Sequence, residues 1–254
     1  MNDLFDLTGR RVVITGGTSG IGLSAAQAFL EAGARVIISG RSKERGDAAL
    51  AHLEDKGEVA FCAADVSDET DINRLTDTAK THLGSVDTIV CAAGINRRGA
   101  PQDLSLDDWD AVMDANLKGT FVTARAFYPQ LCQSGDGRIV TIGSMMSVLA
   151  NDMTAPYAAA KGGVVQLTRS LAAAWAKDDI RANCVLPGWV DTALTRQARL
   201  DMPDLDARVR DRTPLGRWAD PRDIAGTILF LTAAASRFVT GTAIPIDGGF
   251  VMRA

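Results

Sequence analysis

A glycine-rich turn between a strand and a helix most constrains the fold of this chain. Residues 10–16 form a short β-branched run, and Gly16-Gly-Thr-Ser-Gly20-Ile-Gly22 follows it directly. An apolar helical pattern then runs to Gly33, and a second strand-like run covers residues 35–39. In such a βαβ unit the glycines let the backbone approach a pyrophosphate at the positive N-terminus of the helix. The sequence therefore predicts a dinucleotide site, against the alternative of a glycine turn without a ligand.

Strands and helices alternate along the rest of the chain, which is typical of a parallel sheet with ligands at the carboxyl ends of its strands. No linker or change of composition divides the sequence, so we expect residues 1–254 to form one domain. The predicted fold is α/β, a Rossmann-type doubly wound parallel sheet of about seven strands with helices on both faces. Beyond the first unit we expect helices over 42–56, 68–82, 107–133, 154–177 and 221–234, and strands over 58–63, 88–92, 137–142, 180–186 and 242–246.

A tyrosine and a lysine suggest acid–base chemistry. Tyr157 and Lys161 are four residues apart in the predicted helix 154–177, which places them on one face. A phenol, with a reference pKa of about 10, is a poor base near neutrality, and a neighbouring ammonium favours the phenolate. The pair could then exchange a proton with an alcohol or a carbonyl. His52 and His82 fall in charged helical segments without a carboxylate–histidine motif, which disfavours a histidine base.

Composition and charge argue against several other classes of protein. The net charge is −4 and no basic run occurs, so nucleic acid and anionic membranes are disfavoured as partners. No apolar stretch of about 18 residues and no signal region is present, and we expect a cytoplasmic protein. We expect no metal site, because no Cys-x-x-Cys pair occurs among Cys62, Cys91, Cys132 and Cys184.

Several motifs in the same order resemble the classical short-chain dehydrogenase/reductases over essentially the whole chain. They are Thr15-Gly16-x3-Gly20-x-Gly22, Ser144 thirteen positions before Tyr157, and Lys161 four positions after it. The resemblance implies hydride exchange between a nicotinamide and a carbinol carbon, with Tyr157 transferring the hydroxyl proton. It also implies that Lys161 lowers the pKa of the tyrosine and holds the nicotinamide ribose, and that Ser144 hydrogen-bonds the substrate oxygen.

The resemblance also implies a role for Asn116 and shows one departure from the family. Asn116 in Asn-Leu-Lys-Gly119 matches the asparagine that would hold a water linking Lys161 to solvent. Where the family usually has Asn-Asn-Ala-Gly, this chain has Cys91-Ala92-Ala93-Gly94. Two amide side chains that help to tie the central sheet are therefore missing, whereas the glycine nearest the cofactor remains.

NADP is the predicted cofactor, with NAD as the alternative. An acid at the end of the second strand would hold the ribose 2′-hydroxyl and repel a 2′-phosphate, but this chain has Ser39-Gly-Arg41-Ser there. Arg41 offers a planar, charged fork suited to phosphate; the other interpretation is a solvated arginine at a helix start. The family resemblance completes the expected cofactor-binding set: Gly16, Thr18, Ser19, Gly20, Ile21, Gly22, Arg41, Asp65, Val66, Ala93, Gly94, Tyr157, Lys161, Pro187, Gly188, Val190 and Thr192.

Two arginines suggest the substrate class. Arg97 and Arg98 follow Gly94 directly, and this stretch and residues 212–221 are similar to gluconate 5-dehydrogenases within the family. The similarity implies interconversion of an alcohol and a ketone on a small-molecule sugar acid or polyol, with an arginine binding the carboxylate. Alternatively, both arginines are solvated, or one pairs with an acid such as Asp103. The expected substrate-binding residues are Arg97, Arg98, Ser144, Met146, Asn151 and Trp189, with Met145 and Met153 also lining the pocket.

Two alternative functions stay open, and the sequence also suggests an oligomeric state. A 3-oxoacyl-carrier-protein reductase, or another carbonyl reductase, is the nearest alternative enzyme, although no basic docking face stands out. A non-catalytic NADP-binding sensor or scaffold is the alternative of another class, although Ser144, Tyr157 and Lys161 are all present. The family resemblance also implies a homotetramer that buries the long helices near 107–133 and 154–177, the second of which is apolar on several faces.

Overall fold

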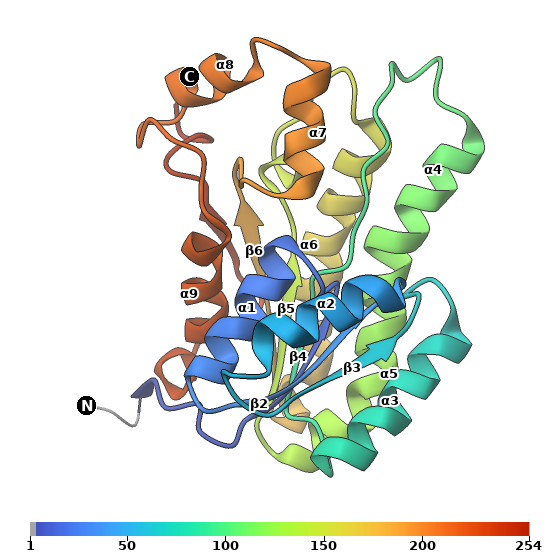
Figure 1. Cartoon of the computed structure of the whole chain (residues 1–254), viewed down its shortest axis with the longest axis vertical. Helices are drawn as coiled ribbons and strands as arrows, with labels where there is room; N and C mark the ends of the chain where they lie inside the picture. Colours follow the sequence, from blue (N-terminus) through green and yellow to red (C-terminus); the bar gives the residue numbers. More distant parts are fainter. Residues whose placement is uncertain (1–3, 254) are drawn as a thin grey trace.

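Seven parallel strands form one sheet in the order β3-β2-β1-β4-β5-β6-β7 in the computed structural model, which describes residues 4–253 (Figure 1). The strand order reverses between β1 and β4, and a crevice opens at such a point outside the carboxyl ends of the strands. The strands are β1 (Arg11–Thr15), β2 (Arg35–Gly40), β3 (Val59–Ala63), β4 (Thr88–Cys91), β5 (Gly137–Ile142), β6 (Ile180–Pro187) and β7 (Ala243–Ile246).

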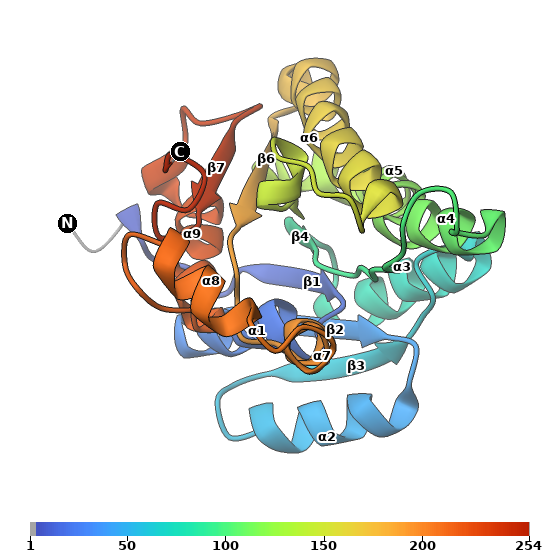
Figure 2. The same ribbon diagram turned by 90° about the horizontal axis from the view of Figure 1, so that it is seen from above.

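Helices cover both faces of this sheet, as Figure 2 shows in the view from above. Residues alternate between the faces along each strand: Val12 and Ile14 pack towards α1, α2 and α9, whereas Val13 packs towards α3, α5 and α6. The helices are α1 (Gly20–Glu31), α2 (Lys43–Leu53), α3 (Glu69–Leu83), α4 (Leu106–Met113), α5 (Gly119–Ser134), α6 (Ala155–Trp175), α7 (Ala193–Asp201), α8 (Leu205–Arg212) and α9 (Pro221–Thr232).

The sequence-based fold is confirmed in its sheet and its covering layers, and differs in two places. The expected helix 107–133 consists of α4, a π-helical turn (Asp114–Lys118) and α5. No element was predicted over residues 193–212, where the structure has α7 and α8 (orange in Figure 1). Both helices are short and rich in charge, so their few buried residues give no clear helical period. No helix among residues 4–253 is long and apolar enough to cross a membrane.

The register of the central strands brings two loops together at the crevice. Thr15 pairs with Cys91, so the glycine turn after β1 and the loop after β4 leave the sheet side by side. Gly16 has a φ of 69°, and a Cβ at this position would lie 2.6 Å from the backbone nitrogen of Ala93. Only glycine allows both this conformation and this close approach. The two loops therefore form one continuous wall.

Candidate functional site

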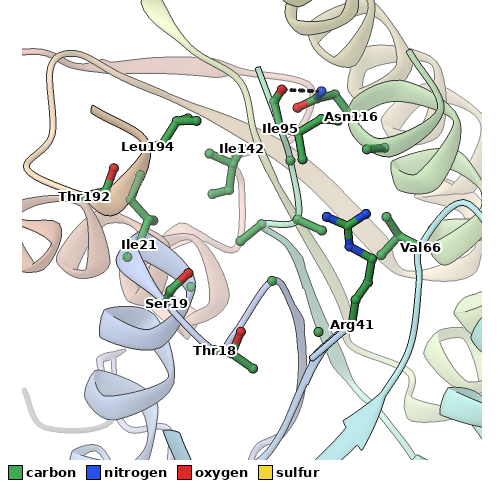
Figure 3. Close-up of a pocket in the computed structure, with 18 of the residues that line it drawn as sticks. Thr18, Ser19, Ile21, Arg41, Val66, Ile95, Asn116, Ile142, Thr192 and Leu194 are labelled. Atoms are coloured by element: carbon green, nitrogen blue, oxygen red, sulfur yellow. Dashed lines mark hydrogen bonds between the residues drawn. The ribbon is translucent and has the colours of Figure 1, made fainter. Parts of the chain in front are cut away.

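A cavity of about 260 Å³ lies against this wall (Figure 3). Of the expected cofactor-binding residues, Pro187, Gly188 and Val190 do not line it; Pro187 and Val190 are buried, and Gly188 faces a second cavity. The expected residues that do line it are Gly16, Thr18, Ser19, Gly20, Ile21, Gly22, Arg41, Asp65, Val66, Ala93, Gly94, Tyr157, Lys161 and Thr192. Sequence reasoning missed Gly40, Arg45, Ala64, Ala92, Ile95, Ala115, Ile142, Ala193 and Leu194.

The glycine turn is shaped to hold an anion at the start of α1. A Cβ at Gly22 would lie 2.3 Å from the carbonyl oxygen of Gly16, so the turn can close only with glycine at both positions. Ser19 is the N-cap residue of α1, but its side chain makes no capping hydrogen bond. The first amide groups of α1 are therefore not satisfied by that side chain, and they suit a phosphate.

Two arginines lie near the end of β2, and an acid from the loop after β3 lies beside one of them. Arg41, just before α2, and Arg45, in the first turn of α2, both line the cavity. Nη1 of Arg41 lies 3.8 Å from Oδ2 of Asp65. Burial raises the pKa of Asp65, but its hydrogen bonds with Ser67 and the charge of Arg41 outweigh burial, and the pKa is lowered. This ionised carboxylate holds the guanidinium beside the cavity.

Tyr157 and Lys161 lie together on α6, as their spacing predicts. Lys161 is 5% exposed, its Nζ donates to the carbonyl oxygen of Ile142 over 2.7 Å, and it lies 5.6 Å from the centre of the Tyr157 ring. Burial lowers the pKa of Lys161 to about 8, although Cys184 and Cys91 act in the opposite sense. Lys161 is therefore mostly protonated at neutral pH.

The expected lowering of the tyrosine pKa is not found. Burial raises the pKa of Tyr157 above its ordinary value, and a hydrogen bond with Ser144 opposes this effect without reversing it. Burial disfavours the charged phenolate, and this is the largest effect on the pKa of Tyr157. Tyr157 is therefore a protonated phenol at neutral pH.

Ser144 is fixed against α6 by its neighbour Ser147. Oγ of Ser147 donates to the backbone oxygen of Lys161 over 2.8 Å and accepts from the backbone nitrogen of Ser144 over 3.2 Å. Oγ of Ser144 accepts from the nitrogen of Met146 over 3.1 Å. These bonds join the turn after β5 to the helix that carries Tyr157, and they position the two hydroxyls relative to each other.

Asn116 presents an unpaired acceptor beside Lys161. It lies in the π-helical turn, fully buried, and its Nδ2 donates to the carbonyl oxygens of Ile95 (2.9 Å, dashed in Figure 3) and Val112 (2.8 Å). Its Oδ1 has no partner among the described residues. A Cβ on Gly94 would lie 2.5 Å from this oxygen and 3.6 Å from Nζ of Lys161. A buried acceptor without a donor is costly, so this position suits a water.

Cys91 and Ala92, which stand where the family usually has two asparagines, do not disrupt the wall of the cavity. Cys91 is buried at the end of β4, and burial raises its pKa to about 12 although Lys161 acts in the opposite sense. The thiol is therefore neutral and packs as a small apolar side chain. Ala92 lines the cavity in place of the usual amide. The sheet keeps its pairing of β1 with β4 through Cys91.

A second cavity of about 550 Å³ meets the first at Tyr157, Ala193 and Leu194. Met153 does not line it, and its backbone oxygen instead accepts from the nitrogen of Gly99 over 3.0 Å. All six expected substrate-binding residues line it: Arg97, Arg98, Ser144, Met146, Asn151 and Trp189. Met145, which was also expected, lines this cavity. The lining residues that were not expected in the substrate site are Asn96, Thr154, Gly188, Ala193, Leu194, Thr195, Gln197, Ala198 and Asp201. Most of these come from α7, which was not predicted.

The two arginines of this cavity have different surroundings. Arg97 is 59% exposed, and its Nε lies 3.5 Å from Oδ1 of Asp108. The suggested pairing with Asp103 is thus wrong, and the partner lies on α4 instead. Arg98 is half-buried, and its Nη2 contacts the sulfur of Met202 at 3.4 Å. No carboxylate pairs with Arg98 in the part of the chain that the structure describes, so Arg98 is the cation available to an anionic ligand.

Known proteins resemble this chain over its whole length. The model of a family described as enoyl-(acyl carrier protein) reductase matches residues 16–251. Gluconate 5-dehydrogenase of Gluconobacter oxydans is 35% identical over 251 residues, which cover 98% of each chain. A 3-oxoacyl-[acyl-carrier-protein] reductase of Thermotoga maritima is also 35% identical, over 97% of this chain and 99% of the relative. A crystal structure of gluconate 5-dehydrogenase from Burkholderia cenocepacia in complex with NADP and tartrate has a TM-score of 0.94 at 37% identity, over 99% of each chain.

The contact of Gly94 with Asn116 gives a prediction for the site. In Gly94→Ala the new methyl group overlaps Oδ1 of Asn116, and overpacking of this kind costs about 1–3 kcal/mol. We expect the affinity for NADPH, measured by fluorescence titration, to fall about ten-fold or more. Gly226→Ala on α9, where a Cβ meets nothing within 4 Å, is the control and should bind as the unmutated protein does. Equal affinities of the two variants would contradict the geometry.

Proposed function

Because this chain belongs to the short-chain dehydrogenase/reductase family, we propose that it interconverts a secondary alcohol and a ketone on a sugar acid or a related polyol, with NADP as cofactor. The observation that carries this proposal is the meeting of two cavities at Tyr157. One cavity contains the glycine turn and Lys161, and the other contains Ser144 and Arg98. A nicotinamide and an acid could therefore meet at one phenol.

The residues of the first cavity fit NADP. The glycine turn and the start of α1 would hold the pyrophosphate, and Arg41 and Arg45 would hold the 2′-phosphate. No carboxylate stands directly at the end of β2, in Ser39-Gly40-Arg41-Ser42, to bind a free 2′-hydroxyl. The relative from Burkholderia cenocepacia was crystallised with NADP, which supports the same choice here. When bound, this cofactor supplies or accepts the hydride.

Four side chains would perform the proton chemistry. In reduction the protonated Tyr157 would donate its proton to the ketone oxygen, and Ser144 would hydrogen-bond that oxygen as charge develops. Lys161 would hold the nicotinamide ribose. Oδ1 of Asn116 would accept a hydrogen bond from a water that returns protons from solvent by way of Lys161. In oxidation Tyr157 must first lose its proton, so its raised pKa favours oxidation at alkaline pH.

Charge favours an acid substrate over an acyl-carrier protein. Arg98 has no carboxylate partner among the described residues and lines the second cavity, so it suits a small carboxylate. The nearby helix α4 carries Asp107, Asp108 and Asp110. Of these, Asp108 is paired with Arg97. An acidic carrier protein would meet this negative surface beside the cavity. The similarity to gluconate 5-dehydrogenases points the same way.

The proposed function predicts that catalysis needs Tyr157. Tyr157→Phe removes the proton donor and should lower kcat for reduction of 5-keto-D-gluconate by at least about a hundred-fold, while the affinity for NADPH stays within a few-fold. Tyr128→Phe is the matched control, because Tyr128 is the only other tyrosine, and its hydroxyl on α5 donates to Asp178 in the turn after α6, away from both cavities. If Tyr157→Phe kept more than about a tenth of the activity, the phenol would not be the acid and base.

Cofactor choice should depend on Arg41. We expect a higher kcat/KM with NADPH than with NADH, and Arg41→Ala should reduce this preference about ten-fold, or about 1.4 kcal/mol. Lys43→Ala is the control, because Lys43 lies two residues away, is 80% exposed and pairs with Asp47. Equal efficiencies with both cofactors in the unmutated protein would refute the preference.

Recognition of the carboxylate should depend on Arg98 more than on Arg97. In Arg98→Ala, kcat/KM for gluconate should fall by a factor that corresponds to about 1.5–3 kcal/mol of transition-state binding energy. The kcat/KM for an uncharged hexitol should fall much less. Arg97→Ala is the matched control, since Arg97 is exposed and paired with Asp108. An Arg98→Ala protein that oxidises gluconate as the unmutated protein does would remove this arginine from the substrate site.

We also propose that the protein is a homotetramer. Three of the exposed apolar side chains lie on α4 and α5, where Leu106 is 80%, Trp109 39% and Phe121 41% exposed. Burial of such a surface between subunits is favourable. Light-scattering chromatography at micromolar concentration should give four times the chain mass of 26.9 kDa, and Phe121→Asp should lower that mass. A monomer would contradict the proposal.

A further inference from the structure

The helix α7 lines both cavities but has little core packing of its own. Ala193 and Leu194 at its start line the two cavities together, and Leu194 lies beside the first of them in Figure 3. Across this helix, all of which the structure describes, only Ala198 is buried. It packs in a small cluster with Trp218, apart from the main core. One buried alanine removes little apolar area from water, so polar contacts must help to hold α7 in place.

Arg199, in the last turn of α7, makes two contacts outside its helix. Its guanidinium carbon lies 3.7 Å from the centre of the ring of Trp218, in the loop before α9. Its Nη2 lies 3.4 Å from Oδ1 of Asp191, two residues before α7 begins. A guanidinium over an indole face is attracted by the ring electrons, and a neighbouring carboxylate adds to this attraction. The side chain therefore ties the end of the helix to chain segments on either side of it.

The two partners of Arg199 are fixed to each other. A parallel bridge joins the segment before α7 to the loop before α9, and the nitrogen of Asp191 donates to the carbonyl oxygen of Ala219 over 2.9 Å. The ring of Trp218 also packs edge-on against Trp189, a lining residue of the second cavity, with the ring centres 5.3 Å apart. Arg199 thus docks α7 on a preformed support at the wall of that cavity.

Arg196 offers a matched comparison on the same helix. It lies closer to Asp191 than Arg199 does, with its Nε 2.9 Å from Oδ1. Its side chain is 66% exposed, against 29% for Arg199, and it stacks on no aromatic ring in the part of the chain that the structure describes. An effect that depends on the carboxylate alone should therefore be larger for Arg196. An effect that depends on Trp218 should appear only for Arg199.

We propose that Arg199 is a positioning residue that holds α7 closed over the two cavities through its contact with Trp218. Arg199 itself lines neither of these two cavities, so it acts through Ala193 and Leu194, which complete both walls. The inference rests on the proposed function for the reaction that the closed site performs. A ligand that binds only the closed state has an apparent affinity that falls with the closed fraction of the protein.

Hydrogen exchange tests this contact without a substrate. In Arg199→Ala, the amides of residues 193–201 should exchange about five-fold faster or more than in the unmutated protein, because the helix opens more often. Arg196→Ala should exchange within about two-fold of the unmutated protein, since an exposed ion pair contributes little. Arg199→Lys, which keeps a charge beside the ring, should lie between the two alanine variants. Exchange that is equal in both alanine variants, or faster in Arg196→Ala, overturns the inference.

Steady-state kinetics tests the effect on the site. In Arg199→Ala, KM for 5-keto-D-gluconate should rise about three-fold or more while kcat stays within about two-fold, because saturating ligand restores the closed state. A lower kcat with an unchanged KM, as a loss of folded protein gives, overturns the inference. Circular dichroism shows whether each variant is folded, and Arg199→Gln repeats both tests if Arg199→Ala does not fold. An unmutated protein that does not reduce this acid contradicts the proposed function, and hydrogen exchange then still decides the inference.

Discussion

The hydrogen bond from Nζ of Lys161 to the carbonyl oxygen of Ile142 holds the site together. It joins α6 to the end of β5 with a buried ammonium, and a buried charge keeps such a contact because losing it is costly. Ser147 adds a second tie through the backbone oxygen of Lys161. Together these bonds fix Tyr157 and Ser144 relative to the central sheet, at the place where the two cavities meet.

The sheet determines where this anchored helix can act. The strand order reverses between β1 and β4, and the loops that follow these strands make the wall of the first cavity. Gly16 and Gly22 are required there because a Cβ at either position would overlap neighbouring backbone. Apolar helices packed on both faces keep the sheet rigid, so the wall has a fixed shape. The chemistry needs that rigidity, since two ligands must be placed against one phenol.

Much of the fold and the centre of the site could be predicted because they depend on local patterns. The glycine turn and the four-residue spacing of Tyr157 and Lys161 reflect backbone geometry, which the sequence reports directly. The helices α7 and α8 could not be predicted, because they are short, charged and stabilised by tertiary contacts of few residues. Because α7 was not predicted, most of the residues that line the second cavity unexpectedly were not predicted either.

Long-range contacts account for the other differences. Arg97, in the loop after β4, pairs with Asp108 on α4. The distance along the sequence does not predict this contact, and sequence analysis suggested Asp103 instead. The raised pKa of Tyr157 depends on its burial by several elements, which spacing alone does not report. Pro187 and Val190 are buried beside the cavity rather than in its lining.

The central claim is that a nicotinamide in the first cavity and a ketone in the second react directly at Tyr157. Reduction of 5-keto-D-gluconate with NADPH that carries deuterium in both C4 positions tests this claim without assuming a stereochemistry. The account predicts a gluconate product with one deuterium on carbon 5, formed at least about a hundred-fold more slowly by Tyr157→Phe. A product without deuterium, or cofactor oxidation without reduction of the acid, would contradict it.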